Sequence, residues 1–132
     1  RKQNGDYSDL LEVEARIPAG DAVLDGDLMV PRGASGITVF AHGSGSSRHS
    51  PRNRSVARVI REAGVGTLLF DLLTREEEEM DARTGHLRFD IRLLAQRLVA
   101  ATRWVARQPD GQHLGLGYFG SSTGGAGLAR MR

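Results

Sequence analysis

The sequence predicts an α/β fold, in which a sheet with parallel central strands is flanked by helices. The first sign is a hairpin pattern: residues 11–17 alternate apolar and polar side chains, and residues 22–30 follow a Pro-Ala-Gly-Asp turn as an antiparallel partner. After the hairpin, short apolar runs alternate with amphipathic segments in the order strand, helix, strand, helix, strand. A serine corner framed by glycines, at residues 120–124, follows the last of these strands.

Two continuous apolar runs form the predicted centre of the sheet, at residues 37–41 and 66–71. Such runs are typical of strands that are buried on both faces. Between them we expect a helix that begins at Pro51 and ends at Gly64. Its apolar side is predicted to comprise Val56, Val59, Ile60 and Ala63.

About sixteen irregular residues are expected after Asp71, including four consecutive glutamates at residues 76–79. Glu79 and Arg83 have the i,i+4 spacing of a helical ion pair, so a short helix is one interpretation of this stretch. The acidic run is predicted to be a solvated face, with the rim of a pocket as the alternative. A longer helix should then run from about Phe89 to Arg107, with an apolar stripe of Ile91, Leu94, Leu98, Ala101 and Val105.

The serine corner has the G-x-S-x-G pattern of a nucleophile elbow, and it predicts that Ser122 is the nucleophile of a hydrolase. Residues 113–119 supply the strand that such an elbow requires, and small residues after Ser122 allow a helix to start close to the sheet. The alternative is a glycine-serine loop without chemistry. Residues 115–120 also match the dinucleotide fingerprint G-x-G-x-x-G, but two of these glycines fall inside the strand, so we treat that match as coincidence.

The sequence His42-Gly43-Ser44-Gly45 follows the strand at residues 37–41 and is predicted to supply the second half of the site. Acyl transfer places negative charge on a carbonyl oxygen, which two oriented backbone N–H groups stabilise. We expect these oxyanion donors to be the N–H groups of Thr123 and Ser44. A flexible surface turn is the alternative for the tetrapeptide taken alone.

Arg48 and Asn53, in the loop that continues from this tetrapeptide, are candidate substrate-binding residues. A guanidinium can bind a substrate carboxylate with two parallel hydrogen bonds, and Asn53 could hold the loop in place. The alternative for each is a place in a solvated, basic helix start. His42 belongs to the donor loop rather than to the position of a catalytic base, so we predict a structural role for it.

Composition excludes several classes of protein. Apart from the glutamates at residues 76–79, the 18 basic and 16 acidic residues are interspersed, which gives no support for nucleic-acid binding. The chain has no cysteine, which removes disulfides and thiolate chemistry, and no cofactor or metal site is predicted. No apolar run is long enough for a membrane span or a signal-peptide core, so we expect no membrane partner and a cytoplasmic location.

Several motifs in this order resemble the dienelactone-hydrolase-like branch of the α/β-hydrolase superfamily. They lie at residues 41–53, 70–74, 85–90 and 117–124, and the resemblance extends roughly from Leu11 onward. It implies Ser122 as nucleophile, the N–H groups of Ser44 and Thr123 as oxyanion donors, and a small-molecule acyl substrate such as an ester or lactone. It also implies an acid and a histidine supplied after later strands.

Two departures from the family qualify these expectations. Dienelactone hydrolases use a cysteine nucleophile, whereas this chain has serine, so their substrate is not carried over. The sequence ends at Arg132, before the acid and the histidine, and residues 1–132 are therefore predicted to form a single, incomplete α/β-hydrolase domain with poor activity on its own. The elbow strand would lie at a sheet edge, covered by a missing C-terminal half or an oligomer. A non-catalytic binding or structural module is the alternative function.

Overall fold

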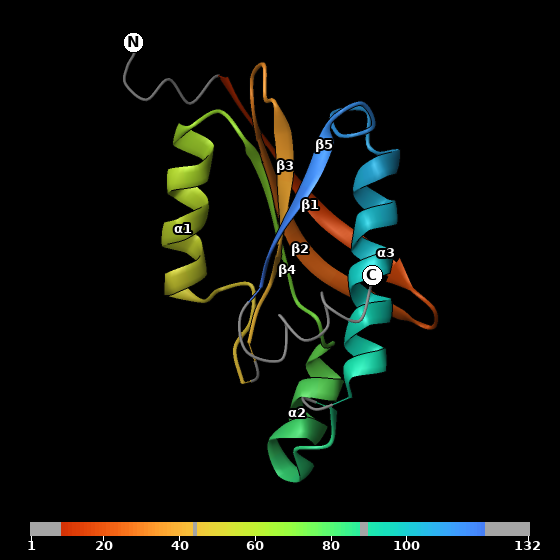
Figure 1. The fold of residues 1–132 in the computed structure, drawn as a ribbon. Helices are drawn as coiled ribbons and strands as arrows, with labels where there is room; N and C mark the ends of the chain where they lie inside the picture. Colours follow the sequence, from red (N-terminus) through yellow and green to blue (C-terminus); the bar gives the residue numbers. More distant parts are fainter. Residues whose placement is uncertain (1–8, 44, 88–89, 121–132) are drawn as a thin grey trace.

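A five-stranded sheet lies between α1 on one face and α3 on the other in the computed structural model, which describes residues 9–43, 45–87 and 90–120 (Figure 1). The acidic helix α2 projects beyond the end of the sheet, beneath α3 (Figure 1). In chain order the elements are β1 (Leu10–Ala19), β2 (Ala22–Pro31), β3 (Gly36–Ala41), α1 (Pro51–Glu62), β4 (Gly66–Phe70), α2 (Arg75–Thr84), α3 (Ile91–Arg107) and β5 (Gly115–Gly120).

The strand order is β1-β2-β4-β3-β5, and it confirms the predicted fold class. β1 and β2 form the antiparallel hairpin, β2 is antiparallel to β4, and β3 is parallel to both β4 and β5. In the described part of the chain β5 therefore lies at an edge of the sheet, as expected. A further segment or a second copy of the chain along this edge stays a prediction.

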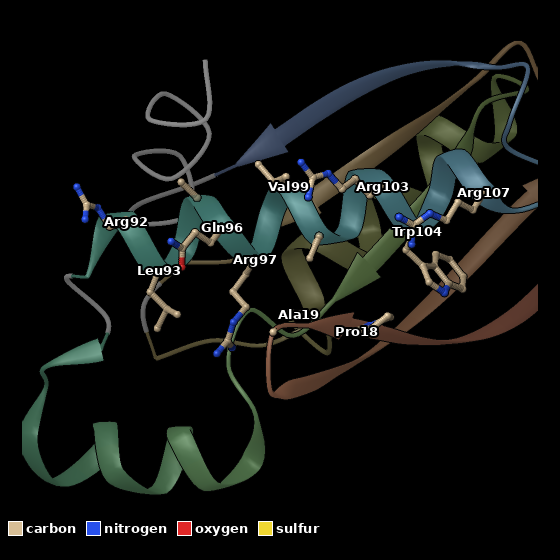
Figure 2. A pocket seen from close by; sticks show the side chains of 13 residues that line it. Pro18, Ala19, Arg92, Leu93, Gln96, Arg97, Val99, Arg103, Trp104 and Arg107 are labelled. Atoms are coloured by element: carbon tan, nitrogen blue, oxygen red, sulfur yellow. The ribbon is translucent and has the colours of Figure 1, made fainter.

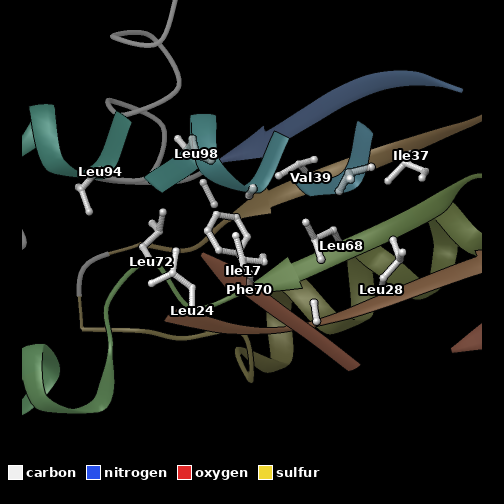
Figure 3. Close-up of a cluster of buried hydrophobic side chains, with 14 of the residues drawn as sticks. Ile17, Leu24, Leu28, Ile37, Val39, Leu68, Phe70, Leu72, Leu94 and Leu98 are labelled. Carbon is white, nitrogen blue, oxygen red and sulfur yellow. The ribbon is translucent and has the colours of Figure 1, made fainter. Parts of the chain in front are cut away.

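The main core lies between the sheet and α3 (Figure 3). Buried side chains from the hairpin, such as Ile17 and Leu24, meet Val39 and Leu68 from the central strands and Leu98 from α3. All five are completely buried, which is the condition under which apolar side chains contribute most to stability. The stripe predicted for α3 is confirmed: Leu94, Leu98, Ala101 and Val105 are buried, and Ile91 is partly buried against the same core.

A smaller core lies on the opposite face, beneath α1. Ala57 of α1 packs there with Phe40 and Leu69, and the ring of Phe40 lies 5.3 Å from that of Phe119, centroid to centroid. The predicted apolar side of α1 is wrong at Val59, which is 64% exposed, and at Ala63, which is exposed just after the helix. The face that meets the sheet is centred on Asn53 and Ala57, one turn apart, so Val59 points toward solvent.

The segment after β4 is not irregular, because α2 occupies ten residues of it. Thr74 and Glu77 form a capping box: the hydroxyl of Thr74 accepts from the N–H of Glu77, whose carboxylate accepts from the N–H of Thr74. Gly85 ends the helix in the left-handed conformation, at a φ of 71°. These signals at both ends explain how a strongly acidic segment becomes helical.

The described helices are amphipathic. α3, with 17 residues, carries four arginines, and α1 also carries four. None of the helices in the described residues has the length and apolar composition needed to cross a bilayer.

Candidate functional site

The two segments predicted to form the site begin side by side. Ala41, at the end of β3, is the register partner of Gly120, at the end of β5, and the two strands are parallel. The chain leaves both strands at the same edge of the sheet, so the loop after β3 and the serine corner after β5 start next to each other. Ser44, Ser122 and Thr123, the predicted oxyanion donors and nucleophile, lie outside the described residues.

A cavity of about 150 Å³ opens beside this edge. From β3 the chain runs to α1 on one face of the sheet, whereas from the neighbouring β4 it runs to α2 and α3 (Figure 1). Ligand sites of α/β sheets form where the chain diverges in this way, outside the carboxyl ends of the strands. The cavity is lined by His42, Gly43, Gly45, Ser46, Leu72, Leu73, Glu78, Asp81, Ala82 and Leu94.

His42 connects the start of the β3 loop, which we define as residues 42–50, to the end of β4. Its Nε2 accepts a hydrogen bond from the N–H of Leu72 at 3.0 Å, so this nitrogen carries no proton. Its Nδ1 lies 2.9 Å from the carbonyl oxygen of Gly43 and is therefore the donor. Burial lowers the pKa of His42, which keeps the ring neutral. The contacts give His42 the structural role that the sequence predicts.

The carbonyl of Gly43 accepts a second hydrogen bond, from the N–H of Ser46 at 3.2 Å. Between these residues Gly45 has a φ of 73°, a conformation that glycine adopts without strain. The hydrogen bond from Ser46 to Gly43 closes a four-residue turn. The turn and the ring of His42 together fix the orientation of the Gly43 carbonyl.

Arg48 attaches the middle of the β3 loop to the sheet. Its backbone N–H and its Nη1 donate to the two carboxylate oxygens of Asp71, at 2.8 Å and 2.5 Å. Its Nε donates to Asp27 of β2 at 3.2 Å. Burial alone would lower the pKa of Arg48, but the carboxylates of Asp71 and Asp27 reverse this and raise it. Arg48 is thus a cationic link between the loop and two strands.

The two candidate substrate-binding residues, Arg48 and Asn53, lie in different parts of the structure. Arg48 lies against Asp71 at the end of β4, while Asn53 is 4% exposed in the first turn of α1, where its N–H donates to the hydroxyl of the N-cap Ser50. A substrate contact by either residue stays a prediction. The contacts of Arg48 account for the presence of an arginine just before a helix N-terminus, where a positive charge is unfavourable.

Sequence reasoning missed Arg97, which is 6% exposed. Figure 2 shows its side chain leaving α3 on the side of the connection between β4 and α2. Its Nη1 donates to the carbonyl oxygen of Leu72 at 3.0 Å, and Nη1 and Nη2 donate to the two carboxylate oxygens of Glu77, both at 2.8 Å. These hydrogen bonds lower the pKa of Glu77. The sequence does contain a sign of a buried role for Arg97, because position 97 lies on the apolar stripe between Leu94 and Ala101.

Glu78 was also missed as an individual residue. It lines the cavity from α2, and burial, followed by the charge of Asp71, raises its pKa although the side chain is largely exposed. Asp81 lines the cavity one turn further on, is 4% exposed and accepts from the N–H of Leu87 at 2.9 Å. Glu76, Glu78 and Glu79 are exposed, as predicted for a solvated face, and Glu78 also forms part of a pocket rim, the alternative interpretation.

A larger hollow of about 700 Å³ runs along the outer side of α3, next to the turn of the β1-β2 hairpin (Figure 2). Arg92, Arg103, Arg107 and Trp104 line it, so its character is basic, whereas the cavity beside the β3 loop is acidic. Within the described ranges, no three His, Cys, Asp or Glu side chains are grouped so as to hold a metal ion.

No family model matches the chain. Two curated relatives, from strains CDC 1551 and H37Rv of Mycobacterium tuberculosis, are each 56% identical over 120 residues and are provisionally named phosphoribosyl transferases. The match covers 91% of this chain and 26% of each relative, so the chain spans about a quarter of their length.

Solved structures of hydrolases share the fold. A dienelactone hydrolase from Anabaena variabilis is 60% identical, with a TM-score of 0.86, over 91% of this chain and 56% of that one. A dienelactone hydrolase-like promiscuous phosphotriesterase from metagenomic libraries, 17% identical, has a TM-score of 0.70 over 92% of this chain and 53% of its own. An esterase from Pyrococcus furiosus, 19% identical, has a TM-score of 0.66 over 97% and 49%. The last two show the fold alone.

Proposed function

Because the chain has the α/β-hydrolase fold of dienelactone-hydrolase-like proteins, we propose that it supplies the nucleophile and the oxyanion hole of a serine hydrolase. The bond cleaved is that of an ester, lactone or similar acyl compound. Ser122 is the nucleophile, and the N–H groups of Ser44 and Thr123 are the oxyanion donors.

One observation carries this proposal: Ala41 and Gly120 are register partners at the ends of neighbouring parallel strands. A nucleophile elbow needs its serine above the end of a strand, and a second oxyanion donor from the adjacent loop. The G-x-S-x-G corner begins at Gly120, the last residue of β5, and the tetrapeptide from His42 begins directly after Ala41. Both predicted halves of the site therefore start from adjacent positions of the sheet.

The proposed reaction begins when the hydroxyl oxygen of Ser122 attacks the acyl carbonyl carbon, and its proton passes to a base. The carbonyl oxygen becomes negatively charged in the tetrahedral intermediate, where two backbone N–H groups stabilise it. The intermediate expels the alcohol, which takes up a proton, and leaves an acyl-enzyme that water hydrolyses. The family resemblance implies a histidine as the base and an acid that orients it, and neither role is assigned to a residue of this chain.

The described part of the β3 loop supports the role of Ser44. A trans peptide group is planar, so its N–H points opposite to its C=O. The carbonyl of Gly43 is held by the ring of His42 and by the N–H of Ser46. An oxyanion hole requires a donor that is oriented in advance, and the held carbonyl of Gly43 supports this role for the amide that follows it.

The name of the mycobacterial relatives points to a different reaction, the transfer of a phosphoribosyl group. This chain matches 26% of each relative, and the match has the fold of hydrolases. We therefore assign acyl hydrolysis to the segment that this chain represents.

The test is labelling of the full-length protein with a fluorophosphonate probe, together with turnover of an activated ester. Ser122→Ala should abolish the labelling and the turnover. Ser121→Ala removes the same hydroxyl group from the neighbouring serine, so it is the matched control and should retain both activities. A folded full-length protein that neither reacts with the probe nor hydrolyses esters would instead favour the non-catalytic module.

A further inference from the structure

A series of hydrogen bonds, joined through the backbone of Leu72, connects the start of α2 with the β3 loop. The carboxylate of Glu77, which caps α2, binds both terminal nitrogens of Arg97 at 2.8 Å. Arg97 donates to the carbonyl oxygen of Leu72 at 3.0 Å, and the N–H of Leu72 donates to Nε2 of His42 at 3.0 Å. Nδ1 of His42 then binds the carbonyl oxygen of Gly43 at 2.9 Å.

Leu72 is the point at which the two halves of this series meet. Its side chain is buried, and its N–H and C=O have partners from different elements, the β3 loop and α3. These two groups belong to different peptide units, so the guanidinium acts on His42 by holding the backbone of Leu72 in position. Because Glu77 binds Arg97 with both oxygens, the direction of the guanidinium is fixed.

The series also determines which nitrogen of His42 carries the proton. Because the N–H of Leu72 donates to Nε2, the ring proton lies on Nδ1, which donates it to the carbonyl oxygen of Gly43. Without the N–H of Leu72 in place, the imidazole can adopt the other tautomer, in which Nδ1 has no proton to donate. The hydrogen bond from His42 to Gly43 therefore depends on Leu72, which Arg97 holds, whereas the bond from Ser46 to Gly43 does not.

We propose that Arg97 and Glu77 are positioning residues for acyl transfer, which orient the β3 loop through Leu72 and His42 without touching the substrate. This inference rests on the proposed function. It predicts that changes at either residue slow the chemical step more than they weaken binding of the substrate.

The kinetic test measures phosphonylation of Ser122 in the full-length protein at a series of probe concentrations. The rate constant at saturating probe reports the chemical step, and the probe concentration that gives half this rate reports binding. Arg97→Met should lower the rate constant roughly tenfold to a hundredfold, since loss of an oxyanion donor costs about a hundredfold to a thousandfold. Glu77→Gln should give a smaller loss, and Arg97→Lys should restore part of the rate. Arg103→Met, an exposed arginine on the same helix, is the matched control.

The spectroscopic test records the ¹⁵N signals of the ring of His42. The wild type should show protonated Nδ1 and unprotonated Nε2, and Arg97→Met should show a mixture of tautomers. Folded Arg97→Met and Glu77→Gln proteins with wild-type rates and the wild-type tautomer would overturn the inference. If the wild type is not phosphonylated at Ser122, the proposed function fails and the catalytic role of these residues fails with it, while the ring signals still decide whether Arg97 orients His42.

Discussion

Replacing Arg48 with methionine removes the guanidinium that attaches the β3 loop to β2 and β4. The backbone N–H of residue 48 still reaches Asp71, but the hydrogen bonds from Nη1 to Asp71 and from Nε to Asp27 are lost. The carboxylate of Asp71, 13% exposed, is then left without its cationic partner. Methionine keeps much of the apolar stem of the side chain, so the change reports mainly on the charge.

The two lost contacts differ in value. A hydrogen bond between charged, partly buried groups contributes about 1.5–3 kcal/mol. The contact with Asp27, whose side chain is 41% exposed, contributes about 0–1 kcal/mol, because water screens it. We therefore expect Arg48→Met to lower the free energy of unfolding by about 3 kcal/mol.

The assay is urea unfolding of the full-length protein at neutral pH. A lower urea concentration at the midpoint, with an unchanged dependence of the unfolding free energy on urea, reports lower stability. Arg52→Met is the matched control, because Arg52 is exposed in the first turn of α1, and it should change stability by less than about 0.5 kcal/mol. Adding Asp71→Asn to Arg48→Met should cost less than the sum of the single changes. Equal stabilities of Arg48→Met and Arg52→Met would refute the reasoning.

Three further changes test the core and the site. Gly26→Ala would place a Cβ 2.8 Å from that of Phe70, so urea unfolding should show a loss of about 1–3 kcal/mol. Leu98→Ala leaves a cavity in the main core and should cost about 2–5 kcal/mol in the same assay, and a wild-type midpoint would contradict the complete burial of Leu98. Stability should fall as the pH drops below about 6.5, with a slope of up to about 1.4 kcal/mol per pH unit, because His42 binds a proton in the unfolded chain and resists it when folded. His42→Gln should remove this part of the slope, and an unchanged slope would contradict a buried, neutral ring.

The sequence predicted the strands, α1 and α3 because their signals are local. Alternation in the hairpin, apolar runs in β3 and β4 and the stripe of α3 each depend on neighbouring residues only. The order of these elements placed the loops after β3 and β5 at one edge of the sheet, since parallel strands bring their carboxyl ends together. The pairing of Ala41 with Gly120 comes from the structure.

The contacts around the site were not predictable in the same way. Arg48 meets Asp71 across 23 positions of sequence, and Arg97 meets Glu77 across 20. Which carboxylate pairs with which arginine depends on how the helices sit against the sheet, and no local pattern states this. An arginine on the apolar stripe of α3 was the available sign of a buried ion pair.

The most direct test of the account is a crystal structure of the full-length protein after reaction with a phosphonate. We expect phosphorus bonded to the hydroxyl oxygen of Ser122, with a phosphonyl oxygen within hydrogen-bond distance of the N–H groups of Ser44 and Thr123. An adduct on another residue, or a phosphonyl oxygen directed away from both amides, would contradict it.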